Sequence, residues 1–240
     1  MTLPLPTPTL VSRTDWLDAR RAFLAREKQL TQLHEQVMNE RRALPWVRVE
    51  KDYRFRGSRG EVSLADLFSG RSQLVVYHFM LGPDWDQGCK SCSFLMDHVD
   101  GARRHFEHHD LSFAAVSRAP WQKIDAFQRR MQWTFPWVSS FENDFNRDFH
   151  VSFTPEEIEQ GGVPYNFKVA GPGDLFDEMP GASVFVRDAQ GTVYHTYSTY
   201  TRGLDFLIGA HHYLDLTPKG RNERHTMDWV RHHDRYETAL

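Results

Sequence analysis

The apolar positions of the chain follow two periods, which predict a long helix followed by a mixed α/β domain. From Thr14 to about Arg42, apolar residues recur at helical spacing with charged residues between them. Thr14 is the expected N-cap and Pro45 marks the end of this helix. Such a helix before the core can cover either the domain or a second subunit. Its apolar positions are Trp16, Ala19, Phe23, Leu30, Leu33 and Val37.

Two continuous apolar runs predict strands that are buried on both faces. They are Leu74–Met80 and Leu111–Ser117. Helical patterns follow each run, over about 91–108 and 120–131. This strand–helix–strand–helix order implies a parallel sheet with right-handed crossovers, and therefore an α/β fold with a central sheet flanked by helices.

Shorter segments complete the predicted organisation. A lead-in and the long helix occupy 1–45, one domain occupies 46–216, and a C-terminal extension occupies 217–240. In the domain we expect short strands over 46–55, short helices over 64–68 and 155–160, and a long loop over 161–181. A hairpin of strands 183–187 and 192–197, a helix over 204–214 and a helix near 227–235 follow.

Composition and charge restrict the partners and the location. The net charge of −3, from 29 basic and 32 acidic residues, gives no attraction to nucleic acid or to anionic membranes. No apolar run is long enough for a transmembrane helix, and residues 1–10 lack the pattern of a signal peptide. We therefore expect a cytoplasmic protein, in which a structural disulfide is uncommon.

The two cysteines, Cys89 and Cys92, lie where a predicted buried strand leads into a helix. The amide groups and dipole of a helix N-terminus lower a thiol pKa, and Lys90 adds a cation, whereas Asp86 opposes the effect. One helical turn separates the two thiols, so one can attack a substrate and the other can resolve the mixed disulfide. Cys89 is the expected nucleophile and Cys92 the resolving thiol, with Trp85 as a neighbour of the site.

These residues predict a thiol–disulfide oxidoreductase that acts on a disulfide or a peroxide and is recycled by an unidentified reductant. The chain has no glycine-rich phosphate loop and no Gly-x-Ser-x-Gly elbow, so no cofactor is expected. No metal is assigned to the site either.

Two other interpretations stay open at this point. The 13 histidines allow a zinc site that joins the cysteine pair to two histidines, drawn from His105, His108, His109, His211 and His212. Alternatively the protein is a non-enzymatic interaction module, with the cysteines as a redox-sensitive switch. The long first helix and the many aromatic residues also suggest a homodimer.

The segment Tyr77–Phe94, which contains the cysteine pair, resembles a bacterial family within the thioredoxin-like superfamily. Members of that family are labelled domains of unknown function or predicted dithiol–disulfide oxidoreductases. The resemblance extends to 133–140, 145–149 and 229–236, and so covers most of the chain from residue 14 onward. It implies a thioredoxin-like fold with Cys89 and Cys92 at its active site.

The order of the elements is also similar to that of peroxiredoxins, with three departures from related patterns. Peroxiredoxins carry a proline seven residues before the reactive cysteine and a hydroxyl residue three before it, whereas here Pro83 is six before Cys89 and Asp86 takes the hydroxyl position. Thioredoxins carry a cis-proline just before the third core strand. Counted back from Asp188, that position is Ala182, which the resemblance makes a neighbour of the active site.

Overall fold

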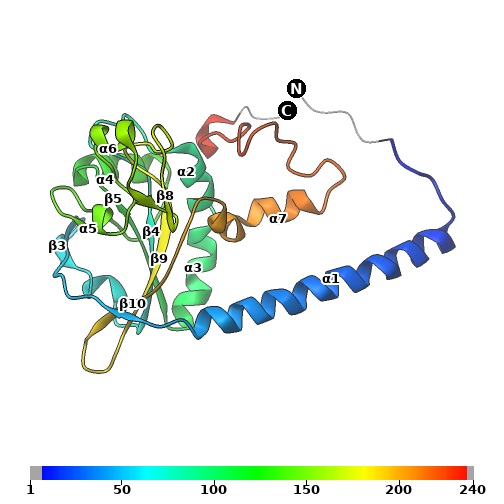
Figure 1. Ribbon diagram of the computed structural model, residues 1–240, viewed down its shortest axis with the longest axis horizontal. Helices are drawn as coiled ribbons and strands as arrows, with labels where there is room; N and C mark the ends of the chain where they lie inside the picture. Colours follow the sequence, from blue (N-terminus) through cyan, green and yellow to red (C-terminus); the bar gives the residue numbers. More distant parts are fainter. Residues whose placement is uncertain (1–6, 237–240) are drawn as a thin grey trace.

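The computed structural model describes residues 7–236, and its first element is the predicted long helix, α1 (Arg13–Arg42). Ser12 and not Thr14 caps this helix, because the Ser12 side chain accepts a hydrogen bond from the Asp15 backbone N–H (3.1 Å). None of the residues of α1, all of which the structure describes, is buried. Figure 1 shows that α1 projects away from the rest of the molecule.

A mixed sheet of eight strands forms the centre of the domain, in the order β1-β10-β9-β4-β5-β6-β2-β3. Strand β4 is parallel to β5 and antiparallel to β9, and β9 pairs with β10 as a hairpin. A parallel strand–helix–strand unit joined to an antiparallel hairpin confirms the expected thioredoxin-like α/β domain. The strands are β1 (Val47–Arg48), β2 (Arg54–Gly57), β3 (Gly60–Ser63), β4 (Gln73–His78), β5 (Leu111–Ser117), β6 (Trp137–Ser139), β9 (Gly181–Arg187) and β10 (Val193–Tyr200).

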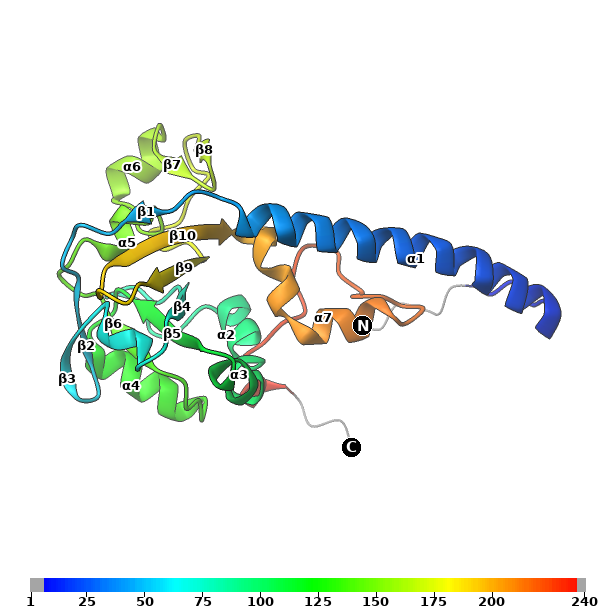
Figure 2. The same ribbon diagram turned by 90° about the horizontal axis from the view of Figure 1, so that it is seen from below.

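Helices cover both faces of this sheet, because the side chains of its central strands alternate between two apolar clusters. Tyr77 of β4 and Phe113 of β5 pack in one cluster, with α2, α3 and α4, and the other face packs against η1 and α5. Figure 2 shows α2, α3 and α4 together on one side of the sheet. These elements are η1 (Asp66–Phe68), α2 (Lys90–Met96), α3 (Val99–His108), α4 (Trp121–Arg130) and α5 (Phe145–Asp148).

The single helix predicted over 91–108 is wrong, because α2 and α3 are separate helices. The ring Nδ1 of His98 donates a hydrogen bond to the carbonyl of Phe94 (2.8 Å). In a continuous helix this carbonyl would instead accept the backbone N–H of His98. That N–H turns instead to the carbonyl of Leu95 (3.1 Å). The ring Nε2 of His98 accepts the backbone N–H of Ala210 (3.0 Å), so this histidine links the helix break to α7 (Gly209–Asp215).

Four further predictions of local structure need correction. The helix expected over 64–68 is only the 3₁₀ turn η1, and the helix expected over 204–214 is divided into η2 (Thr201–Leu207) and α7. The loop 161–181 contains a small hairpin of β7 (Pro164–Tyr165) and β8 (Lys168–Val169). In place of the helix expected near 227–235, the described part of the C-terminal extension, 217–236, forms only the short 3₁₀ turn η3 (His233–Arg235). The short helix α6 (Pro155–Gln160) agrees with its prediction.

The described part of the C-terminal extension packs against the domain although it has little regular structure. Val230 is fully buried and His232 is buried, and the Trp229 ring packs against Phe94 of α2 at 5.4 Å between centroids. Residues 237–240 lie outside the described residues. Among the described helices, none is long and apolar enough to cross a membrane.

Candidate active site

Cys89 occupies the N-cap position of α2, where the chain turns from the sheet into the helix. Its backbone N–H donates to the carbonyl of Met80 (3.0 Å), which follows β4. Its own carbonyl accepts both the N–H and the hydroxyl of Ser93, each at 2.9 Å. The backbone of Cys89 is therefore fixed on both sides, with its side chain at the end of the helix where amide groups favour a negative charge.

Gly88 allows the loop before Cys89 to lie against the aromatic core. A Cβ atom at this position would lie 2.6 Å from the Phe79 ring and 2.7 Å from the Phe127 ring. The carbonyl of Gly88 accepts a hydrogen bond from Nε2 of His232, at 2.8 Å. The C-terminal extension thus holds the residue that precedes the first cysteine.

The two thiols differ in burial and in pKa. Cys89 is half-buried and Cys92 is buried, and both are free thiols. The hydrogen bond from the Cys92 side chain, followed by the backbone N–H groups of Cys92 and Ser91, lowers the pKa of the Cys89 thiol to about 6. Burial and the neighbouring Cys89 raise the pKa of the Cys92 thiol well above its usual range. Cys89 therefore carries the thiolate at neutral pH, while Cys92 keeps its proton.

Tyr77 of β4 lines the same cavity as the pair and hydrogen-bonds the Cys92 side chain. Its own pKa is raised far above the ordinary value, because the ring is buried and the Cys92 sulfur is its neighbour. The phenol consequently stays protonated and is available as a donor to the Cys92 sulfur. Sequence reasoning missed this residue, since Tyr77 read only as one member of a buried strand.

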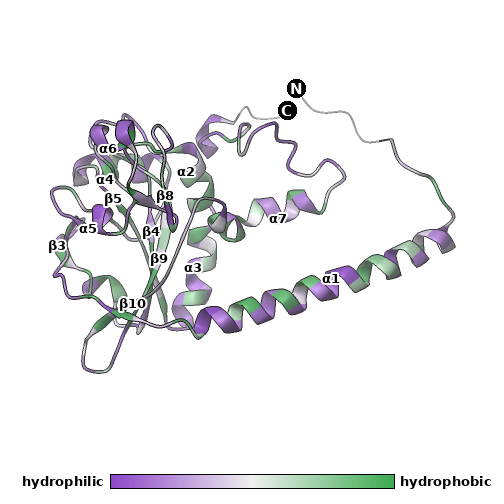
Figure 3. Ribbon diagram, in the orientation of Figure 1, coloured by the Kyte–Doolittle hydropathy of each residue, from purple (hydrophilic) through white to green (hydrophobic). Residues whose placement is uncertain are grey.

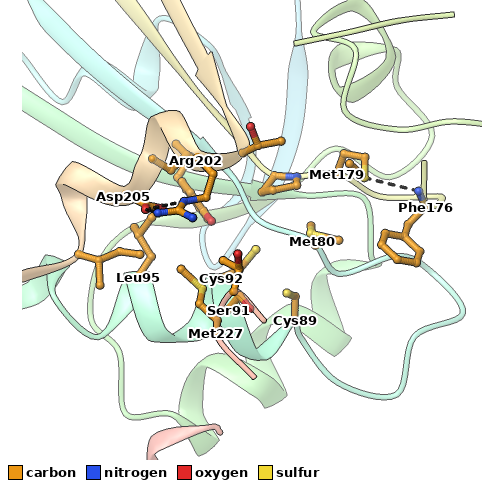
Figure 4. A pocket seen from close by; sticks show the side chains of 16 residues that line it. Met80, Cys89, Ser91, Cys92, Leu95, Phe176, Met179, Arg202, Asp205 and Met227 are labelled. Carbon is orange, nitrogen blue, oxygen red and sulfur yellow. Dashed lines mark hydrogen bonds and ion pairs between the residues drawn. The ribbon is translucent and has the colours of Figure 1, made fainter. Parts of the chain in front are cut away.

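A cavity of about 320 Å³ opens beside the two thiols (Figure 4). Its walls come from α2, from the loop before β9, from η2 and from the C-terminal extension. Most of the lining side chains are apolar, and three are methionines. The cavity is lined by Tyr77, Met80, Cys89, Ser91, Cys92, Leu95, Phe176, Met179, Pro180, Thr201, Arg202, Leu204, Asp205, Ile208, Thr226 and Met227.

The predicted neighbours of the site lie around it and do not line this cavity. Trp85 is half-buried, and its Nε1–H donates to the Asp177 carboxylate (2.8 Å), so it joins the loop before Cys89 to the loop before β9. Asp86 and Lys90 are exposed. The leading causes of the lowered Cys89 pKa are hydrogen-bond donors and not the Lys90 cation.

The assignment of Ala182 to the position before the third core strand is wrong by two residues. Strand β9 begins at Gly181, and Ala182 lies within it, paired with Tyr77. The residue directly before the strand is Pro180, which lines the cavity. The prediction placed the start of this strand at Ser183, two residues late.

The described residues contain no group of three or more His, Cys, Asp and Glu side chains that could hold a metal ion. His211, one of the histidines of the zinc interpretation, is buried against Phe94, with its Nε2 4.0 Å from the Glu223 carboxylate. Its contacts are with the core and the C-terminal extension. The arrangement of residues 7–236 therefore gives the zinc interpretation no support.

The fold and the cysteine pair together define a thioredoxin-like protein with a CxxC dithiol at the start of a helix. The chain belongs to the family described as bacterial protein of unknown function (DUF899), whose sequence profile matches residues 5–236. No curated protein matches the chain.

Solved structures with a similar arrangement are distant in sequence. The peroxidoxin BcpB of Mycobacterium tuberculosis is 15% identical with a TM-score of 0.45, and covers 68% of this chain and 96% of its own. Peroxiredoxin Q of Xanthomonas campestris is 14% identical with a TM-score of 0.46, over 70% and 95% of the two chains. A putative thiol:disulfide interchange protein DsbE of Chlorobium tepidum is 16% identical with a TM-score of 0.41, over 70% and 98%.

Replacing Gly88 with alanine should destabilise the protein, because the added methyl group collides with the Phe79 and Phe127 rings. We expect a loss of about 1–3 kcal/mol in the free energy of unfolding, measured by urea denaturation. Gly101→Ala is the matched control: Gly101 lies in α3 with open space around it, so the same change there should be neutral or stabilising by up to about 1 kcal/mol. Equal losses in both variants would contradict the close packing of Gly88.

The rate at which iodoacetamide alkylates Cys89 should rise with pH through a midpoint near 6, because only the thiolate reacts and its pKa is lowered. Cys92→Ala removes the leading hydrogen-bond donor, so its midpoint should move upward towards that of an ordinary thiol. Lys90→Gln should leave the midpoint unchanged. A wild-type midpoint between pH 8 and 9, the ordinary thiol range, would contradict this account of the site.

Proposed function

We propose that this protein is a thiol–disulfide oxidoreductase in which Cys89 attacks the substrate and Cys92 resolves the mixed disulfide. The observation that carries the proposal is the contrast between the two thiols. Cys89 is accessible from the cavity and has a pKa lowered to about 6, whereas Cys92 is buried and has a raised pKa. A nucleophile that is ionised at neutral pH beside a protonated partner is the state from which the reaction starts.

The cycle balances with two thiols and one disulfide. The Cys89 thiolate attacks one sulfur of a disulfide RSSR, so that a Cys89–SR bond forms, the RS–SR bond breaks, and RS⁻ leaves and takes a proton from water. The Cys92 thiol then gives up its proton and attacks the Cys89 sulfur, which releases the second RS⁻. The protein is oxidised to the Cys89–Cys92 disulfide, RSSR is reduced to two thiols, and a dithiol reductant restores the pair.

Two features of the site help Cys92 to ionise in the second step of this cycle. Once Cys89 is bonded to the substrate, the negative charge that raised the Cys92 pKa is gone, so Cys92 ionises more easily. The Tyr77 hydroxyl, which hydrogen-bonds the Cys92 sulfur, stabilises the thiolate that forms there. We place this chemistry in the cytoplasm, where dithiols are kept reduced between turnovers.

Asp86 is exposed and lies outside the cavity lining, which argues against a peroxidase. At the position where a peroxiredoxin presents a hydroxyl group to the peroxide, this chain presents a carboxylate to solvent. Disulfide exchange needs only the two sulfurs and a way to hold the substrate.

Thiol titration of the wild type in dithiothreitol redox buffers tests the proposal. We expect two free thiols in the reduced protein and reversible conversion to an intramolecular disulfide, seen as the loss of both thiols and of two hydrogen masses. With 5,5′-dithiobis(2-nitrobenzoate), Cys92→Ser should retain a stable mixed disulfide on Cys89. Cys89→Ser should react at least about tenfold more slowly, because its remaining thiol is buried and protonated.

Two results would overturn the proposal. One is equal reactivity of the Cys89→Ser and Cys92→Ser variants, since the two thiols would then have no separate roles. The other is stoichiometric zinc in the purified wild type together with blocked thiols, which would restore the zinc interpretation.

A further inference from the structure

The cavity beside the thiols has walls that favour an apolar occupant. Met80, Met179 and Met227 line it together with Phe176 and Ile208. Methionine side chains are flexible and polarisable, so they adapt to apolar groups of different shape. Figure 4 shows methionine, leucine and phenylalanine side chains around the two cysteines.

The charged groups at the rim of the cavity are already paired with one another. Arg202 donates from Nε to the Asp205 carboxylate (2.7 Å), and Nη1 of Arg221 donates to the same carboxylate (3.1 Å). Arg221 also binds Asp215 (2.8 Å). The cavity lining thus contains one guanidinium group and one carboxylate that are paired with each other, so apart from the Cys89 thiolate it carries no surplus charge with which to select an ionic substrate.

The shape of the site favours a small molecule over a polypeptide. Cys89 and Cys92 are both part of the cavity wall, with the loop before β9, η2 and the C-terminal extension around them. A volume of about 320 Å³ is at the lower end of the range for small-molecule sites. These segments form walls of the cavity onto which both sulfurs open, and a cavity of this volume holds a small substituent and not a folded polypeptide.

We propose that the substrate of the dithiol is a small, uncharged disulfide with apolar substituents, one of which occupies the cavity. This inference rests on the proposed function and adds the substrate class. The methionine wall binds the apolar substituent and thereby places its sulfur against Cys89. Glutathione disulfide, which carries several charged groups, fits neither the apolar wall nor the neutral rim.

The test compares dipropyl disulfide with bis(2-hydroxyethyl) disulfide, which differ only by a methyl or a hydroxyl group at each end. The rate constant for oxidation of the reduced wild type by each disulfide is measured by quenched-flow alkylation. It is then corrected for intrinsic reactivity by dividing it by the rate constant for the reaction of the same disulfide with free dithiothreitol. We expect the corrected constant to be about tenfold larger for dipropyl disulfide, because one terminal methyl group is buried in the cavity. Glutathione disulfide and insulin should both be slower than dipropyl disulfide.

Met227→Gln replaces a wall residue with a polar one of similar length and should reduce this preference to about threefold or less. Met38→Gln on α1, away from the cavity, should leave the preference unchanged. A wild-type ratio of one or below would overturn the substrate class, as would faster oxidation by insulin, glutathione disulfide or tert-butyl hydroperoxide.

Failure of the substrate class and failure of the redox function give different results. Reversible disulfide formation in dithiothreitol buffers with a ratio of one overturns only the substrate class. The unreactive thioether dipropyl sulfide provides a readout without redox chemistry. Calorimetry should show that it binds the reduced wild type more tightly than bis(2-hydroxyethyl) sulfide, and the absence of that difference would overturn the apolar selectivity of the cavity even if the dithiol is active.

The projecting helix α1 carries a second, independent inference. Trp16, Phe23, Leu30 and Val37 lie seven residues apart, and each exposes at least 40% of its surface. Leu33, 55% exposed, stands three residues after Leu30, and Ala19 stands three after Trp16, whereas Arg26 and Glu40 take the corresponding positions after Phe23 and Val37. The stripe is therefore one complete apolar row at heptad spacing with a partial second row, as in the seam of a short coiled coil. Figure 3 shows the hydrophobic positions recurring along α1.

The chain itself does not cover this apolar stripe in the part that the structure describes. The helix is fastened at its last turn, where the Arg41 guanidinium stacks on the rings of Tyr197 (4.5 Å) and Phe206 (5.6 Å). At the same end an apolar groove opens on the sheet, lined in part by Trp46 and Val184. The exposed apolar surface therefore continues from the helix onto the domain.

We infer that α1 pairs with α1 of a second copy of this chain. An apolar seam with heptad spacing is complementary to another copy of itself, and an unsupported helix of this kind gains its stability from such packing. A helix of 30 residues is about 45 Å long. A specific interface buries on the order of 1,200 Å² in total, and the exposed apolar side chains of α1 and of the groove at its base are the surface available for it.

Sedimentation velocity over a range of concentrations tests this pairing, with Leu30→Glu compared with Gln32→Glu. The wild type and Gln32→Glu should be dimers, because Gln32 lies off the seam. Leu30→Glu places a charge in the seam of both copies and should raise the dissociation constant by about a hundredfold or more. The inference would be overturned if the wild type is monomeric at all concentrations, or if Leu30→Glu does not weaken the dimer. Circular dichroism establishes that each variant is folded.

Discussion

The hydrogen bond from the Cys89 backbone N–H to the carbonyl of Met80 is the constraint on which the rest of the site depends. It fixes the nucleophile where the chain leaves the sheet and enters α2. With the backbone held there, the thiol lies among the free amide groups of a helix end while Cys92 falls one turn deeper, in the core. The difference in pKa between two chemically identical groups follows from this geometry.

Much of this arrangement was predictable from the sequence, because local patterns and the spacing of two cysteines determine it. The buried runs at 74–80 and 111–117 specified the parallel pair β4 and β5. The spacing of Cys89 and Cys92, placed after such a run, specified the dithiol at a helix N-terminus. The long helix α1 followed from apolar periodicity alone.

The remainder depends on contacts between residues far apart in the sequence. The break between α2 and α3 is made by His98, whose ring links Phe94 to Ala210. The position of Pro180 depends on where β9 begins to pair with β4, which sequence offsets gave two residues late. Met227 and His232 complete the site from an extension in which the sequence predicted a helix over 227–235, whereas the contacts of these two residues with the domain determine their position.

The contact between His232 and Gly88 spans 144 residues, and it has a consequence for the order in which the protein is made. The loop that presents Cys89 emerges from the ribosome long before the histidine that holds it. At roughly 5 to 20 residues per second, the interval is about 7 to 30 s. During that time the loop before Cys89 lacks its contact with His232, so the dithiol reaches its finished geometry only after the C-terminal extension has been made.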